Sequence, residues 1–183
     1  MNSININNDK FKLEMPLLLI GFNRPKLTKK LLKSIKSVKP KIIYIAGDGP
    51  RNNNLNDAAL CNEVKETFNT DIDWDCKIIK KFRIKNIGLK DNINSALDWF
   101  FENEDMGIII EDDCEINKSF FKFCEELLNK YKDNDKIKVI SGNYYFANLL
   151  KKDSYYFSKC PGTHGWASWK RAWIENDKEM KSW

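Results

Sequence analysis

Residues 16–38 read PLLLIGFNRPKLTKKLLKSIKSV, an apolar run followed directly by a helix start and an amphipathic repeat. The apolar run at 16–22 predicts a buried strand. Pro25 suits the first turn of a helix, because backbone N–H groups have no helical partner there. The apolar side chains that follow recur at the spacing of one helix face, at Leu27, Leu31, Ile35 and Val38. The stretch therefore predicts a strand and a helix that packs on the strand's own sheet.

The same alternation continues along the chain. Further strands are predicted at 41–46, 74–82, 106–110 and 136–140, and helices at about 57–68, 93–101 and 117–131. This order predicts a single α/β domain of the Rossmann-like kind, a mostly parallel sheet flanked by helices. We place the domain at residues 15–183. We expect residues 1–14, which are polar and rich in Asn, to be a disordered or loosely packed N-terminal lead.

The composition narrows the protein class. A chain of 183 residues suits one domain, and no apolar run approaches the ~20 residues that cross a bilayer. Five cysteines without a close pair are typical of reduced thiols in a cytoplasmic protein. The net charge of +5 comes from lysines spread along the chain, which argues against nucleic-acid binding. Peripheral contact with an anionic membrane surface stays open.

An acidic triplet, Glu111-Asp112-Asp113, directly follows the apolar run at 106–110. Like charges so close together repel unless a cation compensates them. A divalent cation is the natural partner, and ligands made only of oxygen favour magnesium, manganese or calcium over zinc. The alternative is an acidic turn exposed to solvent.

Polar residues follow each of the first strands of the predicted sheet. In parallel sheets, ligands bind beyond the carboxyl ends of the strands. Arg24 precedes a helix and suits an anion, whereas Asp48 lies between two glycines and could accept from a base N–H or a ribose hydroxyl. A surface arginine and a simple turn aspartate are the alternatives. Four segments thus predict one crevice, with polar residues Asn23, Arg24, Asp48, Asn86, Gly88, Asp112 and Asp113.

The C-terminal part holds His164, the only histidine, in the glycine-containing loop PGTHGW. Such a loop permits a ligand role. Trp166, Trp169 and Trp173 are predicted to share a helical face, where they either pack in the core or offer a platform for stacking. Lys170 and Arg171 are expected to face solvent.

Several enzyme classes lack their motifs here. Neither GxGxxG nor GxxxxGK[ST] is present, which argues against a dinucleotide-binding Rossmann protein and a P-loop NTPase. No Ser, His and Asp set has the spacing of an acyl-transfer triad. Receiver domains carry paired carboxylates after the first strand, where this chain has Asn-Arg-Pro.

The chain resembles the GT-A class of nucleotide-sugar glycosyltransferases, and within it the group around N-acetylglucosaminyltransferase I and related bacterial transferases. The segments that carry the resemblance span residues 16–173 and occur in the family's order: LLLIGFNRPKLTKKLLKSI, IYIAGDGPR, NIGLKDNINSALDWFF, IIIEDDCEINKSFFKF and HGWASWKRAW.

The resemblance implies a metal-dependent enzyme that transfers a sugar from a nucleotide diphosphate sugar, a UDP-sugar by preference, to a glycan or another hydroxyl acceptor. It makes Asp113, in a DXD-like segment, the ligand of Mn²⁺ or Mg²⁺. Glu111 and Asp112 would lie against the ribose and the donor sugar. The other implied contacts are Asn23, Arg24, Asp48 and Asn86 for the nucleotide, and His164 and Trp166 for a donor or acceptor pocket.

The chain departs from this family after the GWxxW segment. Similar enzymes continue further and place their general base there, whereas this chain ends at Trp183. We therefore expect the acceptor and base part to be missing, and we assign the base to neither Glu175 nor Asp177. Two rivals remain: a sugar-1-phosphate nucleotidyltransferase, whose glycine-rich loop after the first strand is absent, and a non-catalytic module that binds nucleotide or glycan.

Overall fold

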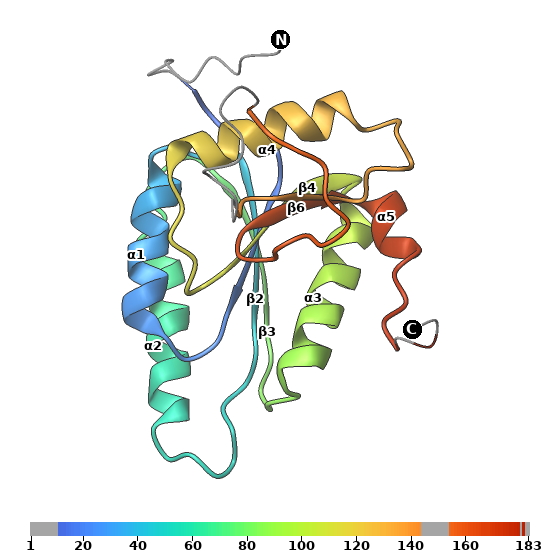
Figure 1. Ribbon diagram of the computed structural model, residues 1–183. Coiled ribbons are helices and arrows are strands. Elements are labelled where there is room, and N and C mark those ends of the chain that lie inside the picture. The colour runs from blue at the N-terminus through green and yellow to red at the C-terminus, as the bar shows by residue number, and fades with distance from the viewer. Residues whose placement is uncertain (1–10, 144–153, 180, 182–183) are drawn as a thin grey trace.

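The computed structural model describes residues 11–143, 154–179 and 181. Its centre is a six-stranded sheet in the order β3-β2-β1-β4-β6-β5 (Figure 1). The strands are β1 (Leu17–Gly21), β2 (Ile42–Gly47), β3 (Lys77–Phe82), β4 (Met106–Glu111), β5 (Val139–Ser141) and β6 (Trp166–Trp169). The helices are α1 (Pro25–Lys36), α2 (Asp57–Thr70), α3 (Leu89–Asn103), α4 (Lys118–Lys130) and α5 (Lys170–Ile174). The predicted α/β fold with a mostly parallel sheet is confirmed.

The first four strands form the parallel part of the sheet. β1 pairs in parallel with both β2 and β4, and β2 pairs in parallel with β3. The chain therefore builds outward from β1 to β3 and then returns to place β4 on the other side of β1. Loops that leave the carboxyl ends of β1 and β4 diverge at such a reversal, and ligands of open α/β sheets bind there.

Helices cover both faces of the sheet. Leu17 and Leu19 of β1 face α1, α2 and α4, whereas Leu18 and Ile20 face α3. All four side chains are buried, because a central strand with helices on both faces has no side turned to water. Figure 1 shows α1 and α2 beside each other on one side of the sheet and α3 on the other.

Local sequence explains where two helices begin. Pro25 is the first residue of α1, as predicted. At α4 the Asn117 side chain accepts a hydrogen bond from the Phe120 N–H (3.1 Å), which satisfies one of the free donors of the first turn.

The prediction of one helical face for the three C-terminal tryptophans is wrong. Trp166 and Trp169 belong to β6, which pairs antiparallel with both β4 and β5, and only Trp173 lies in a helix. Side chains alternate along a strand, so residues three apart point to opposite faces. Trp169 accordingly packs in the core under α4, where its Nε1–H donates to the Leu128 carbonyl (3.2 Å), and Trp166 packs on the α3 side.

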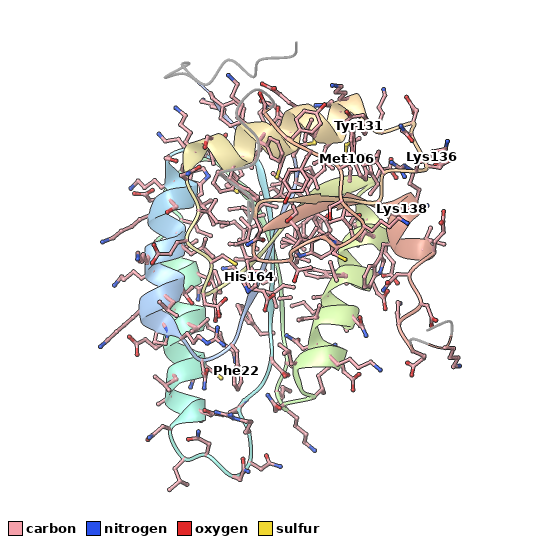
Figure 2. The ribbon with its side chains drawn as sticks, in the orientation of Figure 1. Phe22, Met106, Tyr131, Lys136, Lys138 and His164 are labelled. Atoms are coloured by element: carbon pink, nitrogen blue, oxygen red, sulfur yellow. The ribbon has the colours of Figure 1, made fainter. Side chains whose placement is uncertain are left out.

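Arg171 does not behave as the solvated residue that the sequence predicts. Its guanidinium donates to the backbone carbonyls of Tyr131, Lys132 and Ile137, at 2.9, 2.9 and 3.1 Å. It thereby fastens the chain between α4 and β5 to the start of α5. Figure 2 shows this crowded end of the molecule around Tyr131, Lys136 and Lys138.

Part of the expected N-terminal lead, residues 1–10, lies outside the described residues. Leu13 is fully buried, and its N–H donates to the Val38 carbonyl (2.9 Å). The Glu14 N–H donates to the Glu125 carboxylate of α4 (3.0 Å). Residues 11–14 therefore run along the domain before β1 begins. No helix in the described part of the chain has the length and apolarity to cross a bilayer.

Candidate functional site

The loops after β1 and β4 meet where the strand order reverses. The Asp112 carboxylate accepts from the Phe22 N–H (3.0 Å) and from Arg24 Nη1 (3.2 Å). The same guanidinium forms an ion pair with Asp113. Asp112 is 5% exposed, whereas the side chains of Arg24 and Asp113 are 48% and 45% exposed. The structure thus brings together Arg24, Asp112 and Asp113, which the sequence placed in one crevice.

The acidic triplet carries more negative charge than Arg24 can compensate. Burial raises the pKa of Asp112 above its ordinary value, and the Phe22 N–H and the charge of Arg24 oppose that rise. Burial also raises the pKa of Glu111, and the charges of Asp113 and Asp112 add to it. An anion would be repelled from this edge unless further positive charge came with it.

Asp48 is brought together with Asn86, but in a way that the sequence did not foresee. Its oxygens accept from the Gly49 N–H (2.8 Å), Asn86 Nδ2 (2.9 Å), the Ile87 N–H (3.1 Å) and the Gly88 N–H (3.2 Å). Asp48 is only 6% exposed, and its acceptor sites are used within the protein. It holds the loop before α3, and a nucleotide contact through Asp48 itself stays a prediction.

Two glycines allow this loop its shape. A Cβ on Gly49 would lie 2.5 Å from the Lys85 carbonyl carbon, so a side chain there would force the two loops apart. Gly88 has a φ of +87°, in the region that glycine adopts without strain.

Asp57 is a central residue of this edge that sequence reasoning missed. It is fully buried and accepts from Arg51 Nε (2.6 Å), Arg51 Nη2 (3.0 Å) and Asn23 Nδ2 (2.8 Å). These bonds, the Arg51 pair foremost, lower the pKa of Asp57 to about 2. Asn23 therefore joins the loop after β1 to the loop after β2. The available signal was an aspartate at a helix start six residues after Arg51 in a turn-rich segment.

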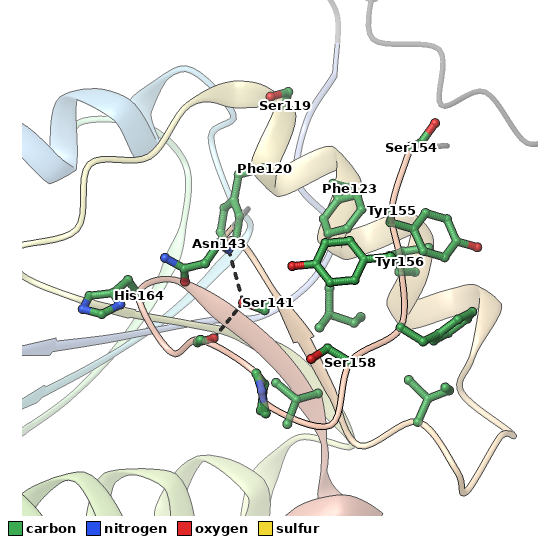
Figure 3. A pocket seen from close by; sticks show the side chains of 18 of the residues that line it. Ser119, Phe120, Phe123, Ser141, Asn143, Ser154, Tyr155, Tyr156, Ser158 and His164 are labelled. Carbon is green, nitrogen blue, oxygen red and sulfur yellow. Dashed lines mark hydrogen bonds between the residues drawn. The ribbon is translucent and has the colours of Figure 1, made fainter. Parts of the chain in front are cut away.

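The two residues proposed for a donor or acceptor pocket lie apart. His164 borders a cavity of about 640 Å³ between α4 and residues 154–164 (Figure 3). Trp166 instead packs on the α3 side of the sheet. The positive charge of His164, when it is protonated, favours the ionised form of Glu111, so the cavity edge and the acidic segment are electrostatic neighbours.

The acidic segment fits a cation only in part. Among residues 11–143, 154–179 and 181, no group of three or more His, Cys, Asp or Glu side chains could hold a metal ion. The sequence predicts a divalent cation as the partner of the triplet, whereas the partner within this chain is Arg24. Mg²⁺ is commonly bound through one or two carboxylates together with substrate phosphates. With its half-exposed carboxylate, Asp113 fits a cation that binds together with a diphosphate.

No known family model matches the sequence, and no curated protein matches it. One similar solved structure is the mannosyltransferase PcManGT from Pyrobaculum calidifontis in complex with GDP-Man and Mn²⁺. It is 10% identical with a TM-score of 0.45, and the match covers 73% of this chain and 36% of that one. Another is a UDP-glucose pyrophosphorylase complexed with UDP-glucose, 11% identical with a TM-score of 0.39, over 70% of this chain and 56% of that one. The chain thus spans about a third and about half of these proteins, and likeness at this level carries no argument about function.

Proposed function

We propose that the chain is a nucleotide-sugar-binding domain of a metal-dependent glycosyltransferase, with a UDP-sugar as donor and a glycan or another hydroxyl compound as acceptor. The observation that carries the proposal is the meeting of Arg24 with Asp112 and Asp113 at the strand-order reversal between β1 and β4. Open α/β sheets bind their ligands at this place. The resemblance of the motifs to GT-A transferases gives the ligand class.

Arg24 is the proposed anion contact. Arginine presents five N–H donors in a planar fork that matches phosphate oxygens. In this chain Nη1 is turned to Asp112 and Asp113, and about half of the side chain is exposed. Asp112 is itself fixed by the Phe22 N–H, so it orients the guanidinium at the crevice.

Asp113 is the proposed ligand of Mn²⁺ or Mg²⁺. Such a cation, when bound, stabilises the negative charge that develops on a departing nucleoside diphosphate. The triplet already carries more negative charge than Arg24 compensates, and a bound diphosphate would add to it. A divalent cation would supply the missing positive charge. Asp113 also has the exposure that a bridging ligand needs.

The neighbouring loops have two further proposed roles. The loop at 86–88, held by Asp48, would line the nucleoside side of the crevice together with Asn23. Glu111 would lie against the donor sugar. It is the first residue of the triplet, and a positive charge on His164 lowers its pKa.

Isothermal titration calorimetry with UDP and GDP, each with and without Mn²⁺, tests the proposal. We expect UDP to bind more tightly with Mn²⁺, and Arg24→Ala to abolish most of this binding. UDP binding that ignores Mn²⁺ would remove the role of Asp113, and no binding of either nucleotide would refute the proposal. A donor-hydrolysis assay on the same samples separates the alternatives, because binding without turnover would identify a non-catalytic nucleotide-binding module.

A further inference from the structure

The cavity beside α4 has walls on three segments that are distant in sequence. Its residues come from α4 and the turn before it, from β5 and its flanks, and from the described residues 154–164 (Figure 3). Its volume of about 640 Å³ is in the range of small-molecule sites. The residues whose hydrogen bonds organise the nucleotide crevice, Arg24, Asp48, Asp57, Asp112 and Asp113, do not line it. The cavity is therefore a second candidate site.

One wall of the cavity is a cluster of aromatic rings. Tyr131, Tyr155 and Phe157 pack edge to face in every pair, with centroids 5.9 to 6.5 Å apart. The hydroxyls of Tyr131 and Tyr155 are hydrogen-bonded (2.7 Å), and Lys130 Nζ donates to the Tyr155 hydroxyl (2.7 Å). Phe123 adds a further ring against Tyr155, at 6.2 Å. These contacts fix the wall before any ligand binds.

The opposite end of the cavity is polar. Ser141 Oγ donates to the Gly162 carbonyl (2.8 Å) and accepts from the Asn143 N–H (3.2 Å). In the described part of the chain, Asn143 Oδ1 is the only buried side-chain oxygen or nitrogen without a hydrogen-bond partner. Buried polar atoms nearly always have a partner, so an unpaired acceptor here indicates a donor that the described residues do not supply. Figure 3 shows the Tyr156 hydroxyl turned to the side of the cavity where Ser141 and Asn143 lie.

We propose that this cavity binds a carbohydrate, with a pyranose ring against the aromatic residues and a hydroxyl or amide N–H donating to Asn143 Oδ1. A pyranose ring has apolar C–H faces and polar hydroxyl edges, and this cavity pairs aromatic walls with hydroxyl and amide groups. Taken with the proposed function, the carbohydrate is the acceptor, so an acceptor site would lie within residues 115–164, contrary to the expectation from the sequence. The acceptor role depends on the proposed function, whereas the binding of a saccharide does not.

A purely apolar ligand fits this lining poorly. Besides its rings, the cavity exposes Ser119, Ser154, Ser158 and Asn117. An acyl chain that covered these groups would remove them from water without offering a hydrogen-bonding group in exchange, which costs binding free energy. A saccharide can pair with them. The lining therefore favours a ligand that is apolar on its faces and polar on its rim.

The position of the cavity suits an acceptor site. Glu115 and His164 line the cavity, and Glu115 follows the acidic triplet by two residues. His164 precedes β6, whose first residue, Trp166, pairs with Ile109 of β4. A saccharide in the cavity would therefore lie beside the end of β4, where the donor sugar is proposed to bind.

Saturation-transfer NMR on the whole chain tests the inference. The probes are cellobiose, lactose, maltose and di-N-acetylchitobiose at millimolar concentration, with n-octanol as the apolar probe. We expect saturation on ring C–H protons of at least one saccharide, and we expect Tyr156→Ala and Asn143→Ala each to weaken its binding about tenfold or more. Asn143→Asp keeps the acceptor oxygen and should retain binding. Trp99→Phe, in α3 on the other side of the sheet, is the matched control and should leave it unchanged.

The inference is overturned if no saccharide receives saturation, or if a saccharide binds equally well to the wild type and to both cavity variants. Preferential binding of n-octanol would also overturn it. UDP titration of the same samples keeps the two proposals distinguishable. Loss of saccharide binding with intact UDP binding rejects the cavity site alone, and saccharide binding without UDP binding rejects the nucleotide proposal alone.

Discussion

Asp48→Asn separates a structural role of Asp48 from a direct nucleotide contact. The substitution keeps the shape of the side chain but turns one acceptor oxygen into an NH₂ donor. On Oδ1 the change removes the bonds from the Gly49 and Ile87 N–H groups; on Oδ2 it removes those from Asn86 Nδ2 and the Gly88 N–H and a longer one from the Ile87 N–H (3.3 Å). Whichever oxygen is replaced, the new NH₂ group at position 48 then faces N–H donors of the loop. Because residue 48 is only 6% exposed, water cannot easily separate them.

The structure sets the expected size of this effect. A hydrogen bond to a charged group contributes about 1.5–3 kcal/mol, so losing two of them would cost roughly 3 kcal/mol after partial relaxation. For a chain of this length each kcal/mol lowers Tm by about 2–4 °C, which gives a fall of roughly 6–12 °C. Urea unfolding, followed by circular dichroism, measures the free energy directly.

Asp75→Asn is the matched control, since Asp75 is an exposed aspartate in the turn before β3. Its effect should stay within about 0.5 kcal/mol. If Asp48→Asn is as stable as the control but binds UDP more weakly, the hydrogen bonds of Asp48 do not hold the loop, and our reasoning about this site is refuted.

Three further predictions concern stability. Trp169→Ala should cost about 3–5 kcal/mol in urea unfolding, because the ring is 2% exposed and fills the core under α4, and a cost below about 1 kcal/mol would contradict that packing. The pKa of Asp57 is lowered to about 2, so its contribution to stability is complete above the unfolded value near 4 and is lost as pH falls toward 2; Asp57→Asn should remove this part of the acid dependence. Burial and the bond to Glu104 raise the pKa of Tyr44 to about 12, so stability should fall as pH rises from about 10 to 12, and Tyr44→Phe should flatten the alkaline limb of the unfolding curve.

The sequence predicted the parallel half of the fold and the meeting point of its loops. In an α/β chain, long apolar runs such as those of β1 and β4 predict buried central strands. The carboxyl ends of parallel strands necessarily lie at the same edge of the sheet. The shared crevice of Arg24, Asp112 and Asp113 follows from these two facts, whereas the ion pairs between them were not predicted.

The features that the sequence did not predict all depend on packing between distant segments. β6 is four residues long, and the spacing of Trp166, Trp169 and Trp173 imitates a helical face, so only pairing with β4 defines it as a strand. Asp57 gains its place in the site through Asn23 of the loop after β1, which bonds its carboxylate together with Arg51. The cavity exists only because residues 154–164 fold against α4.

Arg24 links the two halves of the proposed nucleotide site. It compensates Asp112 and Asp113 in the free protein through Nη1, so its positive charge is already shared when a phosphate binds. A cation on Asp113 would take over that compensation and release the guanidinium, and a diphosphate would in turn supply the oxygen ligands that Asp113 alone does not. Each ligand should therefore bind weakly without the other, and by thermodynamic linkage the gain in affinity must be the same in both directions.

Arg24→Lys keeps the charge but loses the planar fork, so it should retain cation-dependent binding while lowering the affinity for the diphosphate. If UDP and Mn²⁺ bind to the wild type without influencing each other, Arg24 is not shared between the carboxylates and the phosphates, and the site has to be redrawn around another cationic residue.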